Sequence, residues 1–321
     1  MNKIRLRRMT MLLALIMLMT ALTVGCTPKQ DATKKPKDAN SENIEASANY
    51  PMDIEDQFGN KVTIEKKPEK IVSLAPSHTE ILFSLGLGDK IVGVTSFCDY
   101  PEEAKTKEDI GSFKDINLEK IIELEPDLII QYGQGEEESN SRLKEAGITI
   151  LSYEPETVEQ IIELINTLGK VADTSSEAEK VTKDMIDRRD SIVEKVQGAE
   201  NVKVFYEIWH DPLMAAGPGS FMDELMTLAG GDNIAKDAEG EYPQFDVEQL
   251  IERDPEVYLS SNDMEEKTIE SIKSRPGYEN ISAIKNDRIY LLDPNIVSRP
   301  GPRIIDALEI VAKSIHPELF K

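Results

Sequence analysis

The chain has 321 residues, of which 60 are acidic and 37 are basic, so its formal net charge is −23. This length, with 40% hydrophobic residues, is enough for two domains with ordinary apolar cores. Because such an acidic surface repels phosphate groups, the composition argues against binding nucleic acid or an anionic membrane through the folded part.

The N-terminus has the features of a secretory signal. A basic segment at residues 3–8 precedes an apolar stretch at 9–24, which is too short to span a membrane, and Gly25 and Cys26 follow. A small residue directly before a cysteine is typical of a lipoprotein signal. We therefore expect residues 1–25 to be removed and Cys26 to carry a lipid, with plain secretory cleavage as the alternative. Residues 26–50 are polar and aperiodic, which predicts a flexible tether.

Residues 51–155 predict a first α/β lobe. A hairpin over 52–66 turns at Gly59 and Asn60, and short apolar strands then alternate with helices. The strands are expected at 70–74, 91–94, 128–131 and 148–151, and the helices at 75–85, 117–124 and 142–146. This alternation is typical of parallel βαβ units.

Residues 156–200 predict two linking helices, at 157–171 and 176–197. Ser176 with Glu179 is a capping-box start for the second helix, and Gly198 is a typical stop. At 1.5 Å per residue this backbone helix is roughly 33 Å long, which is enough to join two lobes.

Residues 201–321 predict a second α/β lobe on the same plan. Strands are expected at 202–208, 214–216, 257–260 and 288–291, and helices at 222–229, 247–253, 269–274 and 304–315. Residues 111–130 align without gaps on 240–259, and LGLGDKI from Leu85 matches LAGGDNI from Leu228. The predicted fold class is α/β, with two Rossmann-like lobes built on mostly parallel sheets and joined by one long helix.

Loops that follow the predicted strands hold many of the aromatic rings, although only 6% of all residues are aromatic. Ligands of open α/β sheets bind beyond the carboxyl ends of strands, so we expect a cleft between the lobes that takes a bulky, ring-bearing ligand. Phe113 and Tyr242 are equivalent in the repeat and are expected to face each other. The candidate ligand-binding residues are Ser77, His78, Phe97, Phe113, Tyr132, Trp209, His210, Tyr242 and Arg299. Packing of each ring on its own lobe is the alternative.

Histidine and cysteine suggest no dedicated metal centre. His78 and His210 could supply an axial nitrogen to a metal within the ligand, although a hydrogen bond or helix cap is the commoner role of a loop histidine. His316 is expected at the surface, and three histidines so widely spaced do not form a metal cage. Cys98 is interpreted as a small buried thiol. We expect no bound metal, no cofactor and no catalytic residue.

Charged residues near the predicted cleft allow two interpretations each. Arg299 and Arg303 could pair an anionic ligand group or bind local carboxylates. Glu119 and Glu248 are equivalent in the two lobes and lie on the first turn of a helix, where the helix dipole favours a carboxylate. A matched acidic residue on each lobe could equally serve a pseudo-symmetric partner as a docking point.

Four segments resemble the periplasmic binding proteins of ABC importers for cobalamin and ferric siderophores, over nearly all of residues 51–320. They begin at Ile71 (IVSLAPSHTEILFSLGLGDKIVGVTSFCDYP), Asn117 (NLEKIIELEPDLII), Tyr206 (YEIWHDPLMAAGPGSFMDELMTLAGGDNI) and Ser298 (SRPGPRII). The resemblance implies two lobes that open only slightly and a lipid anchor. It implies transporter docking by Glu119 and Glu248, and pocket aromatics at Phe97, Phe113, Tyr132 and Tyr242.

These features predict a lipid-anchored, monomeric capture protein on the extracytoplasmic face of the membrane. It would bind a corrinoid, either cobalamin or a precursor, and deliver it to a permease driven by an ATPase. A ferric siderophore or haem is the alternative ligand within this class. A metal-cofactor enzyme or chelatase on the same fold is the alternative from another class, although the sequence holds no nucleophile with a base and no phosphate loop.

Overall fold

A computed structural model describes residues 48–264 and 267–321. The predicted signal at residues 1–25, Cys26 and most of the predicted tether lie outside the described residues. No helix in the described ranges is both long enough and apolar enough to cross a membrane.

The N-terminal lobe is built on a five-stranded parallel sheet in the order β5-β4-β3-β8-β9. Its strands are β3 (Ile71–Ser73), β4 (Ile91–Val94), β5 (Glu108–Asp109), β8 (Leu128–Tyr132) and β9 (Thr149–Tyr153). Its helices are α2 (Pro76–Ser84), α3 (Leu118–Leu124) and α4 (Glu137–Glu145), and α5 (Val158–Val171) follows as the first linking helix. Two antiparallel pairs are added, β1 (Met52–Glu55) with β2 (Lys61–Ile64) and β6 (Gly111–Ser112) with β7 (Asp115–Ile116). The predicted parallel βαβ plan is confirmed.

The C-terminal lobe is built around β10 (Val202–His210). Three strands run parallel in its sheet, namely β12 (Gly231–Asn233), β13 (Val257–Ser261) and β14 (Ile289–Leu292), whereas β11 (Leu213–Ala215) is antiparallel. The helices are α7 (Phe221–Leu228), α8 (Val247–Arg253), α9 (Ile269–Lys273), α10 (Ser282–Lys285), α11 (Pro294–Val297) and α12 (Ile304–Ile315). The lobe therefore has the mostly parallel sheet expected from the sequence.

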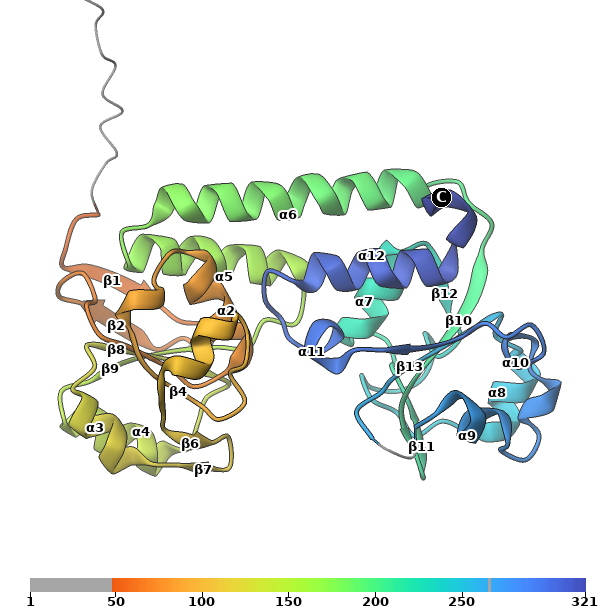
Figure 1. The fold of residues 1–321 in the computed structure, drawn as a ribbon, viewed down its shortest axis with the longest axis horizontal. Coiled ribbons are helices and arrows are strands. Elements are labelled where there is room, and N and C mark those ends of the chain that lie inside the picture. The colour runs from red at the N-terminus through yellow and green to blue at the C-terminus, as the bar shows by residue number, and fades with distance from the viewer. Residues whose placement is uncertain (1–47, 265–266) are drawn as a thin grey trace, which may run out of the picture. The chain divides into compact units, whose positions relative to one another are not determined.

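The long helix α6 (Ser175–Val196) runs along one side of both lobes, over α5 and α12 (Figure 1). It ends as predicted, with Gly198 at φ +82°. The predicted capping box at its start is wrong, because the helix already includes Ser175 and its N-cap, Thr174, makes no side-chain capping bond. The short connection from α5 explains this, since the Thr174 amide donates to the Gly169 carbonyl at 2.7 Å and turns the chain at once into α6.

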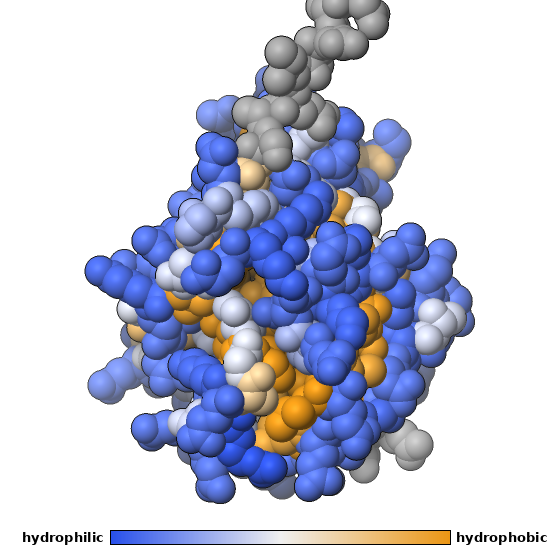
Figure 2. Space-filling model, turned by 90° about the vertical axis from the view of Figure 1, so that its left-hand side faces the viewer, coloured by the Kyte–Doolittle hydropathy of each residue, from blue (hydrophilic) through white to orange (hydrophobic). Residues whose placement is uncertain are grey.

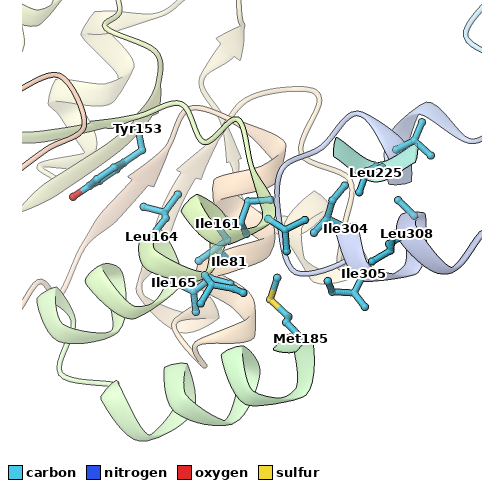
Figure 3. Packing of buried hydrophobic residues seen from close by; sticks show 14 of the residues in the cluster. Ile81, Tyr153, Ile161, Leu164, Ile165, Met185, Leu225, Ile304, Ile305 and Leu308 are labelled. Carbon is cyan, nitrogen blue, oxygen red and sulfur yellow. The ribbon is translucent and has the colours of Figure 1, made fainter. Parts of the chain in front are cut away.

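One apolar cluster extends through the helices of both lobes. It includes Ile81 of α2, Ile165 of α5, Met185 of α6, Leu225 of α7 and Leu308 of α12. Figure 3 shows these side chains gathered between the helices, with Met185 reaching up from α6. Arg188 of α6 adds an ion pair to Asp306 of α12 at 2.6 Å. Because the lobes share this core, separating them would expose apolar surface to water.

The internal repeat is confirmed in the backbone. Asn117 and Asp246 both cap a seven-residue helix with their side chains, and those helices, α3 and α8, both end at a left-handed residue, Glu125 at φ 50° and Asp254 at φ 48°. Each helix leads into a central strand, β8 or β13.

The second repeated motif needs a one-residue shift. Its two positive-φ glycines are Gly86 at φ +73° and Gly230 at φ +75°, each directly after the residue that closes α2 or α7. Leu85 is therefore equivalent to Ala229 rather than to Leu228.

His316 was expected at the surface, and this is wrong. It is buried where α12 ends, and its Nε2 lies 3.2 Å from the Gly230 carbonyl oxygen. Elsewhere the surface is mainly polar, as expected from the charge. Figure 2 shows one face dominated by hydrophilic residues, with a hydrophobic stretch in its lower half.

Candidate functional site

A pocket between the two lobes is the candidate ligand site, and we call it the interlobe pocket. Its volume is about 260 Å³. The N-terminal lobe contributes Tyr132 at the end of β8 and residues 154–156 after β9, and the C-terminal lobe contributes Tyr242 among others. The remaining lining residues are Tyr206, Ile208, Gly219, Phe221, Met222, Glu241, Val297, Ser298 and Pro300. Two of the predicted rings therefore line one pocket from opposite lobes.

Carboxylates dominate the charge of this pocket. Glu154, Glu156 and Glu241 line it, and its described lining holds neither lysine nor arginine. Burial, followed by Glu154, raises the pKa of Tyr132 to about 12. Burial also raises the pKa of Tyr242, and Glu241, Glu156 and Glu154 add to this. Both phenols therefore stay protonated at neutral pH and can donate a hydrogen bond to a ligand.

Phe113 lies beside this pocket rather than in it. It stands between β6 and β7 and lines a second hollow within the N-terminal lobe, which Tyr132 also lines. Four predicted rings are unusually exposed for their size, with exposed fractions of 57% for Phe97, 54% for Phe113, 40% for Trp209 and 50% for Tyr242. Exposed rings of this kind favour ligand contact over packing within a lobe.

The predicted residues Ser77 and His78 are buried in the first turn of α2. The side chain of His78 has no exposed surface, and neither ring nitrogen has a hydrogen-bond partner among the described residues. Burial lowers its pKa to about 3. Its ring contacts that of Tyr132, with the centroids 5.8 Å apart. His78 is thus a neutral, fully buried imidazole next to a pocket-lining ring, and a ligand contacts it only if the side chains that cover it move.

Trp209 and His210 lie at the end of β10, outside the interlobe pocket. Their rings stack with centroids 6.1 Å apart, and the Trp209 indole donates to the Asp211 carbonyl at 2.9 Å. Phe97 is likewise absent from the lining of that pocket. No group of three or more His, Cys, Asp or Glu within residues 48–264 and 267–321 is placed to hold a metal ion.

Cys98 is the buried thiol that the sequence predicted. Its sulfur lies 3.2 Å from the hydroxyls of Thr79 and Thr95. Burial raises the pKa of this thiol, which keeps it protonated and unreactive.

Arg299 and Arg303 bind carboxylates, but these belong to the other lobe rather than being local as the second interpretation expected. Arg303 pairs with Glu80 of α2 through two hydrogen bonds of 2.8 and 2.6 Å. Arg299 pairs with Glu80 at 3.3 Å and with Asp99 at 2.5 Å. The Arg303 guanidinium also lies 4.0 Å from the centre of the Tyr100 ring. We call these five side chains the interlobe clasp.

Glu119 and Glu248 occupy equivalent places in the two lobes. Both are exposed on the first turn of a short helix, α3 or α8. Within the described part of the chain, neither carboxylate forms an ion pair, although Glu119 lies next to Lys120 in sequence. Their charges are therefore available to a partner.

Apart from Tyr132 and Tyr242, sequence reasoning missed the residues that line the interlobe pocket, among them its three glutamates and Ile208. Glu154 and Glu156 could have been found, because they directly follow a predicted strand, and Glu241 because it precedes Tyr242. Ile208 lies within a strand, where side-chain direction depends on a register that the sequence does not give.

Comparison with known proteins places this architecture. Residues 71–296 match the family described as periplasmic binding protein. An uncharacterized ABC transporter substrate-binding lipoprotein of Bacillus subtilis, YvrC, is 33% identical over 317 residues, which cover 96% of this chain and 97% of YvrC. A vitamin B12-binding protein of Vibrio cholerae is 32% identical over 244 residues, 76% of this chain and 87% of that protein.

A solved structure gives the same picture of the fold. A possible iron-binding periplasmic solute-binding protein from Staphylococcus epidermidis superposes with a TM-score of 0.71 at 30% identity, and it covers 78% of this chain and 100% of its own.

Proposed function

Because the chain belongs to the periplasmic binding protein family, we propose that it captures a corrinoid, either cobalamin or a precursor, between its two lobes. As a family member it is an extracytoplasmic substrate-binding protein of an ABC importer and not an enzyme. The corrinoid is the further step. The lobes of the proposal are residues 51–155 and 201–321, joined by 156–200.

The observation that carries the corrinoid is the pairing of aromatic rings with negative charge at the interlobe pocket. Tyr132 and Tyr242 offer flat faces and phenol donors from opposite lobes. Haem brings two propionates and many ferric siderophores carry net negative charge, so Glu154, Glu156 and Glu241 would repel them. A corrinoid presents neutral amides around its ring, and the one phosphodiester of a complete corrinoid lies in its nucleotide loop, so this conflict is smaller. The vitamin B12-binding relative supports the same choice.

The two arginines strengthen this argument. Recognition of propionates or carboxylate siderophores calls for free cations, and guanidinium forks are well suited to it. Arg299 and Arg303 are instead bound to Glu80 and Asp99 in the interlobe clasp. A ligand without carboxylates leaves the clasp intact.

Calorimetric titration tests the ligand. Cyanocobalamin, cobinamide, haem and a ferric hydroxamate would be titrated into the protein, with Tyr242→Ala as the site variant and Val247→Ala as a matched exposed control on the same lobe. We expect micromolar or tighter binding of a corrinoid that weakens only in Tyr242→Ala. If the protein bound haem or the ferric hydroxamate but no corrinoid, the proposed ligand would be wrong and the bound compound would take its place in the proposal.

We also propose that Glu119 and Glu248 dock the two lobes onto the permease. The double variant Glu119→Lys/Glu248→Lys should abolish corrinoid uptake in cells and leave the affinity of the purified protein unchanged. The control is Glu123→Lys/Glu252→Lys, which reverses an equivalent exposed pair later on the same two helices. Equal uptake by the two double variants would reject docking at the first pair.

Anchoring through Cys26 completes the proposal, with residues 26–50 as the tether. The relative YvrC is named a lipoprotein. Cells fed a labelled fatty acid should label the wild-type chain and the Cys98→Ala variant but not Cys26→Ala. Label retained in Cys26→Ala would reject the anchor at this residue.

A further inference from the structure

A second hollow, which we call the side pocket, opens next to the interlobe pocket but belongs wholly to the N-terminal lobe. It lies among the β6–β7 hairpin, the end of β8 and helix α4, and its volume is about 350 Å³. Tyr132 lines both pockets, so they are adjacent compartments that share one ring as a wall. A ligand in the interlobe pocket can therefore extend into the side pocket past Tyr132.

The apolar part of the side pocket is made from core residues. Leu74 and Leu143 are almost fully buried, and Ile116 and Leu118 pack against the same core cluster. Phe113 adds an aromatic face. Small-molecule pockets span about 300 to 1,000 Å³, and this volume suits one bicyclic ring with part of a sugar.

Gln131 supplies a fixed acceptor on the wall. Its side chain is 4% exposed, and both amide protons are engaged, by the Gln134 carbonyl at 2.9 Å and the Ser152 hydroxyl at 2.8 Å. Its Oε1 receives no hydrogen bond from the described residues, so it is free to accept one from a ligand in the pocket. A Cβ on Gly135 would lie 2.7 Å from this oxygen, so glycine keeps the space before it open.

Asn140 of α4 lines the same pocket in a similar way. Its Nδ2 donates to the Gln134 carbonyl at 2.7 Å, which leaves its Oδ1 as a second acceptor. The charged lining residues Asp115 and Glu136 outnumber Lys114. This combination disfavours an anion and favours a neutral group that carries hydrogen-bond donors.

We propose that the side pocket takes the heteroaromatic base at the end of the nucleotide loop of a complete corrinoid, while the corrin ring stays in the cleft. This assignment rests on the proposed function. The exocyclic amine of a purine base can donate hydrogen bonds to the two acceptors, Gln131 and Asn140. Dimethylbenzimidazole has no N–H group with which to do so. Cobinamide lacks the loop and leaves the side pocket empty. The affinity order is adenine-type corrinoid, then cobalamin, then cobinamide.

Titration of all three corrinoids by calorimetry tests this order. Leu118→Trp fills the side pocket, and Val247→Trp is the matched control, because residue 247 holds the equivalent first position of α8. We expect the wild-type protein to bind the adenine-type corrinoid at least tenfold more tightly than cobinamide. Leu118→Trp should abolish that difference and leave cobinamide binding unchanged, and Val247→Trp should behave as wild type.

A second variant keeps the test valid if Leu118→Trp folds poorly. Asn140→Leu removes one acceptor at a half-exposed helix position and should reduce the preference for the adenine-type corrinoid over cobalamin severalfold. Equal affinities of the wild-type protein for all three corrinoids would overturn the side-pocket assignment and leave the proposed function standing. Binding of none would overturn both.

Discussion

The helical side of the molecule and the cleft side use their side chains in opposite ways. On the helical side, α5, α6 and α12 close over one apolar cluster, and the interlobe clasp pairs buried charges across the lobes. On the cleft side, large rings such as Phe113 and Tyr242 are half exposed, and the carboxylates of the interlobe pocket face no cation in its described lining. On the helical side, apolar and charged side chains are paired within the protein. On the cleft side, rings and carboxylates remain available to a ligand.

This difference indicates that the helical side stabilises the fold and that the cleft side binds the ligand. A shared core resists separation of the lobes, so the cleft is largely formed before the ligand arrives and less ordering is needed on binding. Changes on the helical side should therefore affect the free energy of unfolding, and changes on the cleft side should affect affinity.

The largest effect should come from the shared core. Leu308→Ala removes a fully buried side chain from the cluster that both lobes use. We expect a loss of about 3 kcal/mol in the free energy of unfolding, measured by urea titration. Leu319→Ala, at an exposed position nearby, should stay within about 0.5 kcal/mol of wild type. Two separate unfolding transitions would contradict a core common to both lobes.

The interlobe clasp should come next. Glu80→Gln keeps the shape of the side chain but leaves Arg299 and Arg303 without their shared carboxylate. The free energy of unfolding should fall by about 2 kcal/mol, with corrinoid affinity unchanged. The exposed Glu103→Gln is the control. A large affinity loss in Glu80→Gln would show that the arginines act in binding.

Burial of His78 should make stability depend on pH. Its pKa is lowered from 6.5 to about 3 in the folded chain, so the unfolded chain binds this proton first as the pH falls. Stability from this group is complete above the unfolded value and decreases below it, by about 1.4 kcal/mol between pH 7.5 and 5.5. His78→Phe should lack this component in urea titrations at the two pH values. Identical pH slopes for the two proteins would contradict it.

The smallest effects should appear at single cleft rings. Phe113→Ala should weaken corrinoid binding by about 1 kcal/mol, a factor of about five, because one flat contact is lost. Phe97→Ala and Trp209→Ala should cost roughly half as much, since these rings line neither the interlobe pocket nor the side pocket that Phe113 lines. Calorimetry on the three variants gives the order of their losses in affinity. A larger loss in Trp209→Ala than in Phe113→Ala would place the ligand nearer the end of β10.

The elements that the sequence predicted well are those with local signals. The capping residue Asn117 and the helix-breaking Pro126 correctly predicted where α3 lies. The helical spacing of apolar residues over 304–315 predicted both ends of α12. The β6–β7 hairpin and β12 were missed because their short strands are mostly polar, whereas the equally short β3 lies in an apolar run. The start of α4 was missed because its acidic first turn resembles a loop.

From the sequence, the location of the candidate site could be predicted only as the loops that follow the strands. Tyr132 and Tyr242 were found because rings after strands converge at one sheet edge. Burial of His78 and pairing of Arg299 with Glu80 were not, since both depend on contacts between residues distant in sequence.

Hydrogen exchange with and without cyanocobalamin tests most directly whether the ligand lies between the lobes. We expect slower exchange of backbone amides in two loops from opposite lobes, residues 131–136 and 240–246, with α6 unchanged. Slower exchange in only one of these loops, or in neither, would contradict binding between the lobes.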